Sequence, residues 1–221
     1  MFIGHYAIAL AAKRIAPRVS LGTTLCAAEF LDFVWPVLLL TGAEHFHIVP
    51  GITKVTPLDF YDYPYSHSLV AALGWSVLFG AVYFALKREK RTALLLGAIV
   101  FSHWVCDVVV HRPDLPVLPH GPYLGLGVWN SVAGTLVLEG AMFLAGLWLY
   151  QRATRAKDRI GLVAFGAFVG FTVAIYVGNV FGPPPPNEQV VAWMGLSQWL
   201  MVAWAAWFDR HRTPTAEPPV L

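Results

Sequence analysis

The chain has 221 residues, of which 57% are hydrophobic and only 13% charged, and its mean hydropathy is +0.59. Soluble domains carry about 25% charged residues, so this composition excludes an ordinary soluble protein and indicates an integral membrane protein. The net charge of +2 gives no reason to expect a nucleic-acid partner. We predict a single transmembrane helical domain over residues 1–212 and a flexible cytoplasmic tail over residues 213–221.

Hydrophobic segments separated by charged residues predict the helices in chain order. The first segment, from Phe2 to Ile15, is too short to span a bilayer. It is no convincing signal peptide, because no positive charge precedes it. Six segments close to the ~20 residues that cross a bilayer core follow: 20–41, 66–86, 92–111, 128–151, 160–181 and 190–208. The predicted fold is therefore an all-α integral membrane protein, a bundle of about six transmembrane helices plus a short N-terminal inserted helix.

The positive charges predict how these helices are oriented. If the spans alternate, Lys54 and Arg112 fall on one side and the other thirteen of the 15 Lys and Arg residues on the opposite side. Cytoplasmic loops carry the excess of Lys and Arg, so the thirteen are expected in the cytoplasm together with the C-terminus. The outer side then holds the two longest loops, 42–65 and 112–127, which are rich in aromatic residues.

Ionisable side chains occur where the solvent should be hydrocarbon. His103, Asp107 and His111 step by four residues along one face of a predicted span, and Glu29 and Asp32 share a face of another. Burying such groups in a bilayer costs several kcal/mol each unless they are paired, hydrated or bound to an ion. Counting along the helices places Asp32 and His103 roughly 15–20 Å from the cytoplasmic charges, which predicts a polar cavity that opens outward.

The residue types in this set are those of a metal site. Imidazole and carboxylate groups at positions i and i+4, here His103 and Asp107, can hold one divalent ion, and catalytic Zn²⁺ commonly has three protein ligands and an open position for water. His67 is the expected third ligand, from a neighbouring helix, and Asp32 or His5 can complete the shell. We predict a divalent metal as the cofactor, and Zn²⁺ is the metal that we favour.

Two further residues are candidates for catalysis rather than for metal binding. Glu29 or His111 can act as a general base, or can orient a ligand imidazole through a hydrogen bond.

Each feature also has a structural interpretation. His67 can belong to an interfacial helix cap built on Ser66, and His103 can form a helix-locking hydrogen bond with Asp107. Glu29 and Glu139 can serve polar packing or a proton path. For the remaining histidines we favour solvated loops or tails, and for the two cysteines no function: His45, His47, His120 and His211, and Cys26 and Cys106.

Four elements resemble the bacterial membrane-bound metal-dependent hydrolases, also described as LexA-binding, inner membrane-associated hydrolases. They are Gly4-His5, the acidic motif from Glu29 to Asp32, His67-Ser68, and Ser102-His103 followed by Asp107. The resemblance covers roughly residues 1–115. The chain lacks the Pro-Asp-x-Asp form of the acidic motif and one histidine of the family's usual pair, so the resemblance does not carry over a second metal position.

The resemblance implies a metal-dependent hydrolase of the cell inner membrane, and the depth of the site indicates a lipid or lipid-linked phosphoester as substrate. The lipid bilayer and such a lipid-like substrate are the expected partners. A proton- or metal-ion-coupled transporter is the alternative, with Glu139 and Asn179 lining the path. A third hypothesis is a scaffold whose polar core only fixes the helix register.

Overall fold

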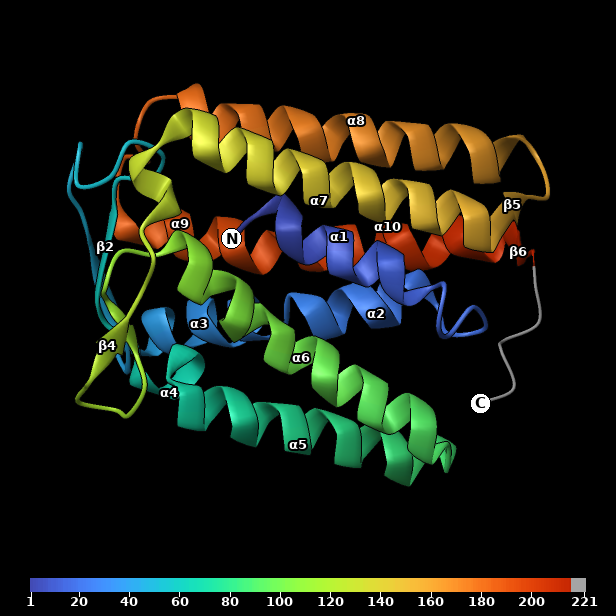
Figure 1. Cartoon of the computed structure of the whole chain (residues 1–221), viewed down its shortest axis with the longest axis horizontal. Helices are drawn as coiled ribbons and strands as arrows, with labels where there is room; N and C mark the ends of the chain where they lie inside the picture. Colours follow the sequence, from blue (N-terminus) through green and yellow to red (C-terminus); the bar gives the residue numbers. More distant parts are fainter. Residues whose placement is uncertain (216–221) are drawn as a thin grey trace.

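The computed structural model describes residues 1–215, which form mainly α-helices (Figure 1). A short apolar helix, α1 (Ile3–Ala12), comes first. Four later helices are long and single, and four shorter ones form two consecutive pairs. Their bounds are Leu21–Ala28 for α2, Phe30–Thr41 for α3, Leu69–Lys87 for α5, Lys90–Val110 for α6, Val132–Ala153 for α7, Arg159–Phe181 for α8, Glu188–Ser197 for α9 and Trp199–Arg210 for α10.

Five helical segments are long and apolar enough to cross a membrane: α5, α6, α7, α8 and the pair α9–α10. The pair α2–α3 makes a sixth when its two halves, bent by 56° at Glu29, count as one span. These segments match the six predicted spans, and α1 matches the predicted short N-terminal helix. The prediction of a helical bundle with about six helical segments long and apolar enough to span a membrane is therefore confirmed.

Short elements that the sequence analysis did not predict close the two ends of the bundle. Three antiparallel pairs of strands and two short helices connect the long helices. They are β1 (His45–Ile48) with β2 (Leu58–Asp62), β3 (Leu115–Pro116) with β4 (Tyr123–Leu124), β5 (Thr154–Ala156) with β6 (Arg212–Pro214), α4 (Pro64–His67) and the 3₁₀-helix η1 (Val128–Asn130).

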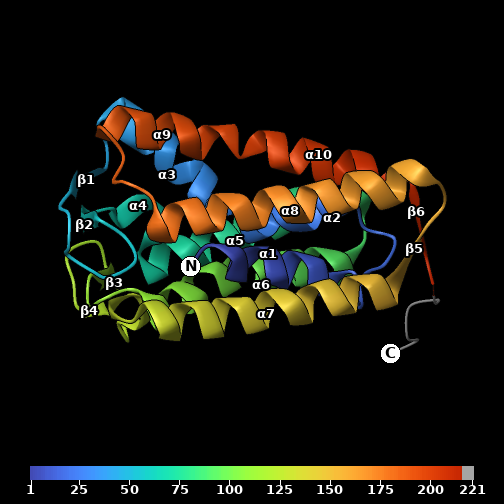
Figure 2. The ribbon, with the colours of Figure 1, turned by 90° about the horizontal axis from the view of Figure 1, so that it is seen from above.

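The two ends of the bundle differ in character. Strands β1 to β4 lie together at one end, which we call the hairpin end, whereas β5 and β6 lie at the other (Figures 1 and 2). The connections that carry the thirteen Lys and Arg residues lie at this second end, which we call the basic end. Two of these charges are not solvated, because the Lys13 and Arg212 residues are only 3% and 8% exposed.

The predicted C-terminal tail starts inside an ordered strand. Thr213 and Pro214 pair with Arg155 and Thr154 of β5. The final part of that tail, residues 216–221, lies outside the described residues.

Helix α1 lies in the middle of the bundle, in contact with α2, α6, α7 and α8 (Figure 2). A glycine permits its closest approach to α7, because a Cβ atom at Gly146 would lie 2.6 Å from the carbonyl oxygen of Ala7. The outer surface is apolar; for example, Val77 is 72% and Leu86 75% exposed. The molecule thus has apolar side chains on its outer surface and polar side chains inside, around α1.

Candidate metal centre

Helix α6 places His103 and Asp107 one turn apart on the same face, with His103 Nε2 3.2 Å from Asp107 Oδ2. The other ring nitrogen, Nδ1, lies 2.7 Å from the carbonyl oxygen of Ala28. Ala28 ends α2, and the last carbonyls of a helix lack intrahelical partners, so the break in the α2–α3 span makes this oxygen available. A carbonyl only accepts hydrogen bonds. Nδ1 of His103 therefore carries a proton, and Nε2 faces the carboxylate of Asp107.

Two further elements bring His67 and Asp32 to the same point. His67 ends α4, and its Nε2 lies 3.4 Å from Asp32 Oδ1 and 3.8 Å from Asp107 Oδ2. Asp32 lies in the first turn of α3, and its Oδ1 is also 3.7 Å from His103 Nε2. The Asp32 side chain is 27% exposed, whereas the His67 and Asp107 side chains are at most 6% exposed. Asp32 is thus more exposed than His67 or Asp107.

The donor set fits a divalent transition metal. Ligand atoms of Asp32, His67 and His103 lie within 4.8 Å of one another, as do those of His5, His103 and Asp107. Tetrahedral Zn²⁺ with bonds of about 2.0–2.1 Å holds its ligand atoms ~3.3 Å apart. The observed separations of 3.2 to 3.8 Å between imidazole nitrogens and carboxylate oxygens are close to that value.

His5 joins the cluster from the other side of Asp107. Its ring stacks on that of His103 with centroids 3.6 Å apart, and its Nε2 lies 3.2 Å from Asp107 Oδ1. The Met1 amino group contacts the same oxygen. Both groups therefore bind Oδ1 of Asp107, while Oδ2 faces His67 and His103. The site residues predicted as metal ligands are all brought together, with His5 better placed to orient Asp107 than to complete the four-atom set.

The two buried glutamates have different environments. Glu29 stands at the break between α2 and α3 and is 1% exposed, and neither of its carboxylate oxygens has a hydrogen-bond partner among the described residues. Glu139 Oε2 instead accepts hydrogen bonds from the backbone N–H groups of Phe2 (2.8 Å) and Gly4 (3.4 Å). Glu139 thereby neutralises the N-terminal end of α1, and Asn179 is exposed on α8.

His111 lies apart from this cluster. It follows the last residue of α6, and its Nδ1 is 3.0 Å from Asp114 Oδ1. Its ring packs against Trp129, with the centroids 4.4 Å apart. Among the loop histidines, His45 pairs with Asp62.

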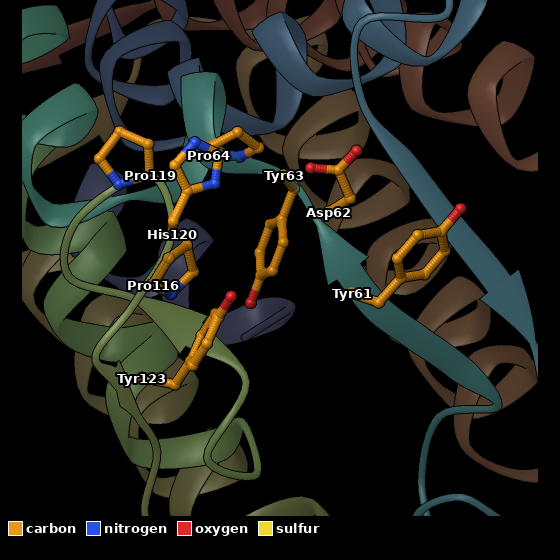
Figure 3. Close-up of a pocket in the computed structure, with 8 residues that line it drawn as sticks. All are labelled: Tyr61, Asp62, Tyr63, Pro64, Pro116, Pro119, His120 and Tyr123. Carbon is orange, nitrogen blue, oxygen red and sulfur yellow. The ribbon is translucent and has the colours of Figure 1, made fainter.

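A cavity of about 270 Å³ opens at the hairpin end (Figure 3). Tyr63 and Tyr123 extend into it from facing segments, and prolines form much of the rest of its wall. The Tyr63 ring, which lines the cavity, packs against His67 with the ring centroids 5.4 Å apart. None of the predicted metal ligands lines this cavity, so it is not the polar cavity that the sequence predicted around them; we call it the aromatic cavity.

The sequence analysis missed Glu44 and misread Ser66. Glu44 Oε1 accepts the backbone N–H groups of Tyr65 (2.7 Å) and Ser66 (2.8 Å), and Oε2 accepts the Ser66 hydroxyl (2.6 Å). Burial raises the pKa of Glu44, and these three hydrogen bonds oppose the rise. The helix cap proposed for Ser66 is supplied by Ser68, which caps α5 through the N–H of Ala71. No periodic pattern marks Glu44, because it lies in the connection after α3.

Comparison with known proteins identifies no relative. No protein-family model, no curated protein and no solved structure matches the chain. The fold defines the class of protein, a bundle of helices long and apolar enough to span a membrane, and the hydrolase resemblance remains a prediction from four short motifs.

Proposed function

We propose that this protein is a metal-dependent hydrolase with a zinc-type site inside the membrane. The observation that carries the proposal is the orientation of His103. Its Nε2 faces carboxylate oxygens of Asp107 and Asp32 at 3.2 and 3.7 Å and has no hydrogen-bond partner among the described residues. A buried nitrogen lone pair and carboxylate oxygens repel one another unless a cation, either a metal ion or a proton, lies between them, and we propose the metal ion.

Asp32, His67, His103 and Asp107 would hold the metal, and His5 would fix Asp107 through its second oxygen. A divalent metal there would supply a coordinated water of pKa about 7 and polarise a phosphoryl or carbonyl oxygen. Glu29 is the general base that the site offers, since its buried carboxylate has both oxygens free to take a proton. We assign the base to Glu29 rather than to His111, because His111 belongs to neither group of ligand atoms that could hold one metal.

The substrate class follows from the location of the site. His103 lies seven residues before the end of α6 at Val110, or about 10 Å along the helix. A headgroup in the aromatic cavity at the hairpin end would contact Tyr63, which packs against His67, and this favours a lipid or lipid-linked phosphoester. We place the basic end and the C-terminus in the cytoplasm of a bacterial inner membrane, on the distribution of Lys and Arg.

Metal content is the direct test. Protein purified without a metal-binding tag should contain about one Zn²⁺ or similar ion per chain by inductively coupled plasma analysis. His103→Ala should lose the ion, whereas His120→Ala, a loop histidine in the wall of the cavity, should retain it. A wild type without metal after reconstitution with Zn²⁺ would refute the proposal.

Activity and topology are tested separately. The metal-loaded protein should release product from a lipid phosphoester in detergent, and Glu29→Gln should abolish that activity while leaving metal content unchanged. Gradient-dependent ion flux in proteoliposomes that requires Glu139 would instead establish the transporter alternative. A C-terminal fusion should give fluorescent green fluorescent protein and inactive alkaline phosphatase; the reverse pattern would invert our orientation.

A further inference from the structure

The imidazole of His67 is held by a chain of hydrogen bonds that leads out of the bundle. Its Nδ1 lies 2.7 Å from Ser66 Oγ, and Ser66 Oγ lies 2.6 Å from Glu44 Oε2. His67 and Ser66 are 4% and 0% exposed, and Glu44 is 1% exposed. The three side chains therefore form a buried chain of hydrogen bonds from the connection after α3 to the metal cluster, and we call Glu44, Ser66 and His67 the relay.

The proton positions in the relay follow from the donors and acceptors. Glu44 faces three donors, namely two backbone N–H groups and the Ser66 hydroxyl, which is the environment of an ionised carboxylate. A carboxylate only accepts, so the single hydroxyl proton of Ser66 points to Glu44. Ser66 Oγ must then accept a hydrogen bond from His67, and the proton of His67 lies on Nδ1.

This direction determines what His67 presents to the cluster. With the proton on Nδ1, the lone pair is on Nε2, the atom 3.4 Å from Asp32 Oδ1. If the relay ran in the opposite direction, Nε2 would carry a proton and could bind no metal. In metal sites, the residues that accept the ring N–H of a ligand histidine orient its imidazole, and their loss typically lowers metal affinity 10- to 100-fold.

We propose that Glu44 and Ser66 are positioning residues that set the tautomer and the ring orientation of His67 for metal binding. The inference rests on the proposed metal site and adds to it a hydrogen-bond relay that begins at Glu44, outside the predicted spans. It assigns to Glu44 and Ser66 a role that neither a helix cap nor loop packing requires.

Glu44→Gln is the decisive variant, because it keeps the shape of the side chain and reverses the direction of the hydrogen bond between residue 44 and Ser66. The amide oxygen can still accept the backbone N–H groups, while its NH₂ group donates to Ser66 and leaves the hydroxyl proton for His67 Nδ1. Ser66→Ala removes the relay, and Ser66→Thr retains the hydroxyl. Asp59→Asn is the matched control, since Asp59 is a hairpin-end carboxylate that pairs with Arg112 and makes no contact with His67.

Two measurements on the full-length protein in detergent test the relay. The first is Co²⁺ affinity, from competition with a chelator, together with the visible spectrum of the bound ion. We expect 10- to 100-fold weaker binding and an altered spectrum in Glu44→Gln and Ser66→Ala, and near wild-type behaviour in Ser66→Thr and Asp59→Asn. The second is the ¹⁵N chemical shift of His67 in the metal-free protein, which should report the Nδ1–H tautomer in the wild type and the Nε2–H tautomer in Glu44→Gln.

The outcomes separate the two proposals. If the wild type binds no Co²⁺, both fail. If it binds Co²⁺ and Glu44→Gln matches it in affinity, spectrum and tautomer, the metal site stands and the relay is wrong. The tautomer measurement needs no metal, and it decides the question even if Ser66→Ala does not fold.

Discussion

Removal of the Asp209 carboxylate should destabilise the basic end of the bundle. Asp209 Oδ2 accepts hydrogen bonds from Lys13 Nζ at 2.8 Å and the Leu21 N–H at 2.9 Å, and its Oδ1 accepts the Tyr150 hydroxyl at 2.7 Å. Lys13 also donates to the carbonyl of Val19 at 2.6 Å. One carboxylate of α10 thus joins the end of α1, the start of α2 and the end of α7.

The size of the effect follows from burial. Lys13 and Asp209 are 3% and 9% exposed, and removing one partner of a buried ion pair costs about 3–5 kcal/mol. Because the pair lies near the aqueous end of the bundle, we expect the lower limit for Asp209→Ala, about 3 kcal/mol, or a change of more than ~100-fold in the unfolding equilibrium. Unfolding in mixed micelles, followed by tryptophan fluorescence, measures it.

Two variants control for other causes. Glu89→Ala removes an exposed carboxylate at the same end, whose side chain makes no cap hydrogen bond to α6, and should leave the unfolding midpoint close to that of the wild type. Lys13→Met with Asp209→Leu removes both charges and should recover at least half of the loss, since no unpaired charge remains buried. An Asp209→Ala protein within ~0.5 kcal/mol of the wild type, the usual range of surface substitutions, would refute this description of the helix junction.

The remaining predictions concern packing and pH. Gly146→Ala should destabilise the protein by about 1–3 kcal/mol, because its Cβ would lie 2.6 Å from the Ala7 carbonyl oxygen, whereas Gly166→Ala, at a position open within 4 Å, should be neutral or stabilising. Thermal unfolding of both variants checks this. The hydrogen bond with His211 lowers the pKa of Asp158 below its ordinary value of 3.8. The stability it contributes is therefore present above that value and lost as the pH falls through the lowered pKa. The difference in unfolding midpoint between the wild type and Asp158→Asn should disappear on acidification, and a difference that grows would contradict it.

The bundle was predictable from the sequence because membrane spans are encoded locally. A run of about 20 apolar residues bounded by charge is sufficient to locate a span, and α6 and α8 lie within two residues of their predicted bounds. The break at Glu29 was not predicted, since nothing in the segment 20–41 interrupts its apolar character there except the glutamate itself.

The cluster was predictable in its members and not in its details. His67, His103, Asp107 and Asp32 were found because a buried ionisable group in an apolar segment stands out in sequence. Glu44 did not stand out, because an acidic residue in a loop is ordinary. The same reasoning misjudged Lys13, which was counted as a solvated cytoplasmic charge, since its partner Asp209 is 196 residues away. Long-range pairing of this kind has no local signal.

A metal and a set of shared protons are the two ways to neutralise this cluster, and chelation distinguishes them. Asp32 and Asp107 bring two negative charges to the imidazoles of His67 and His103, and the Met1 amino group already pairs with Asp107. A metal ion between the imidazoles and the carboxylates would balance the remaining charge, and so would a proton on His103, whose Nε2 lies 3.2 Å from Asp107 Oδ2. A metal that binds only the folded state stabilises it by about 2.7 kcal/mol at a free concentration 100 times its dissociation constant. We therefore expect EDTA dialysis to lower the unfolding temperature of the wild type and Zn²⁺ to restore it. His103→Ala should respond to neither. Equal unfolding temperatures of the dialysed and zinc-loaded wild type would favour a proton-bridged polar core.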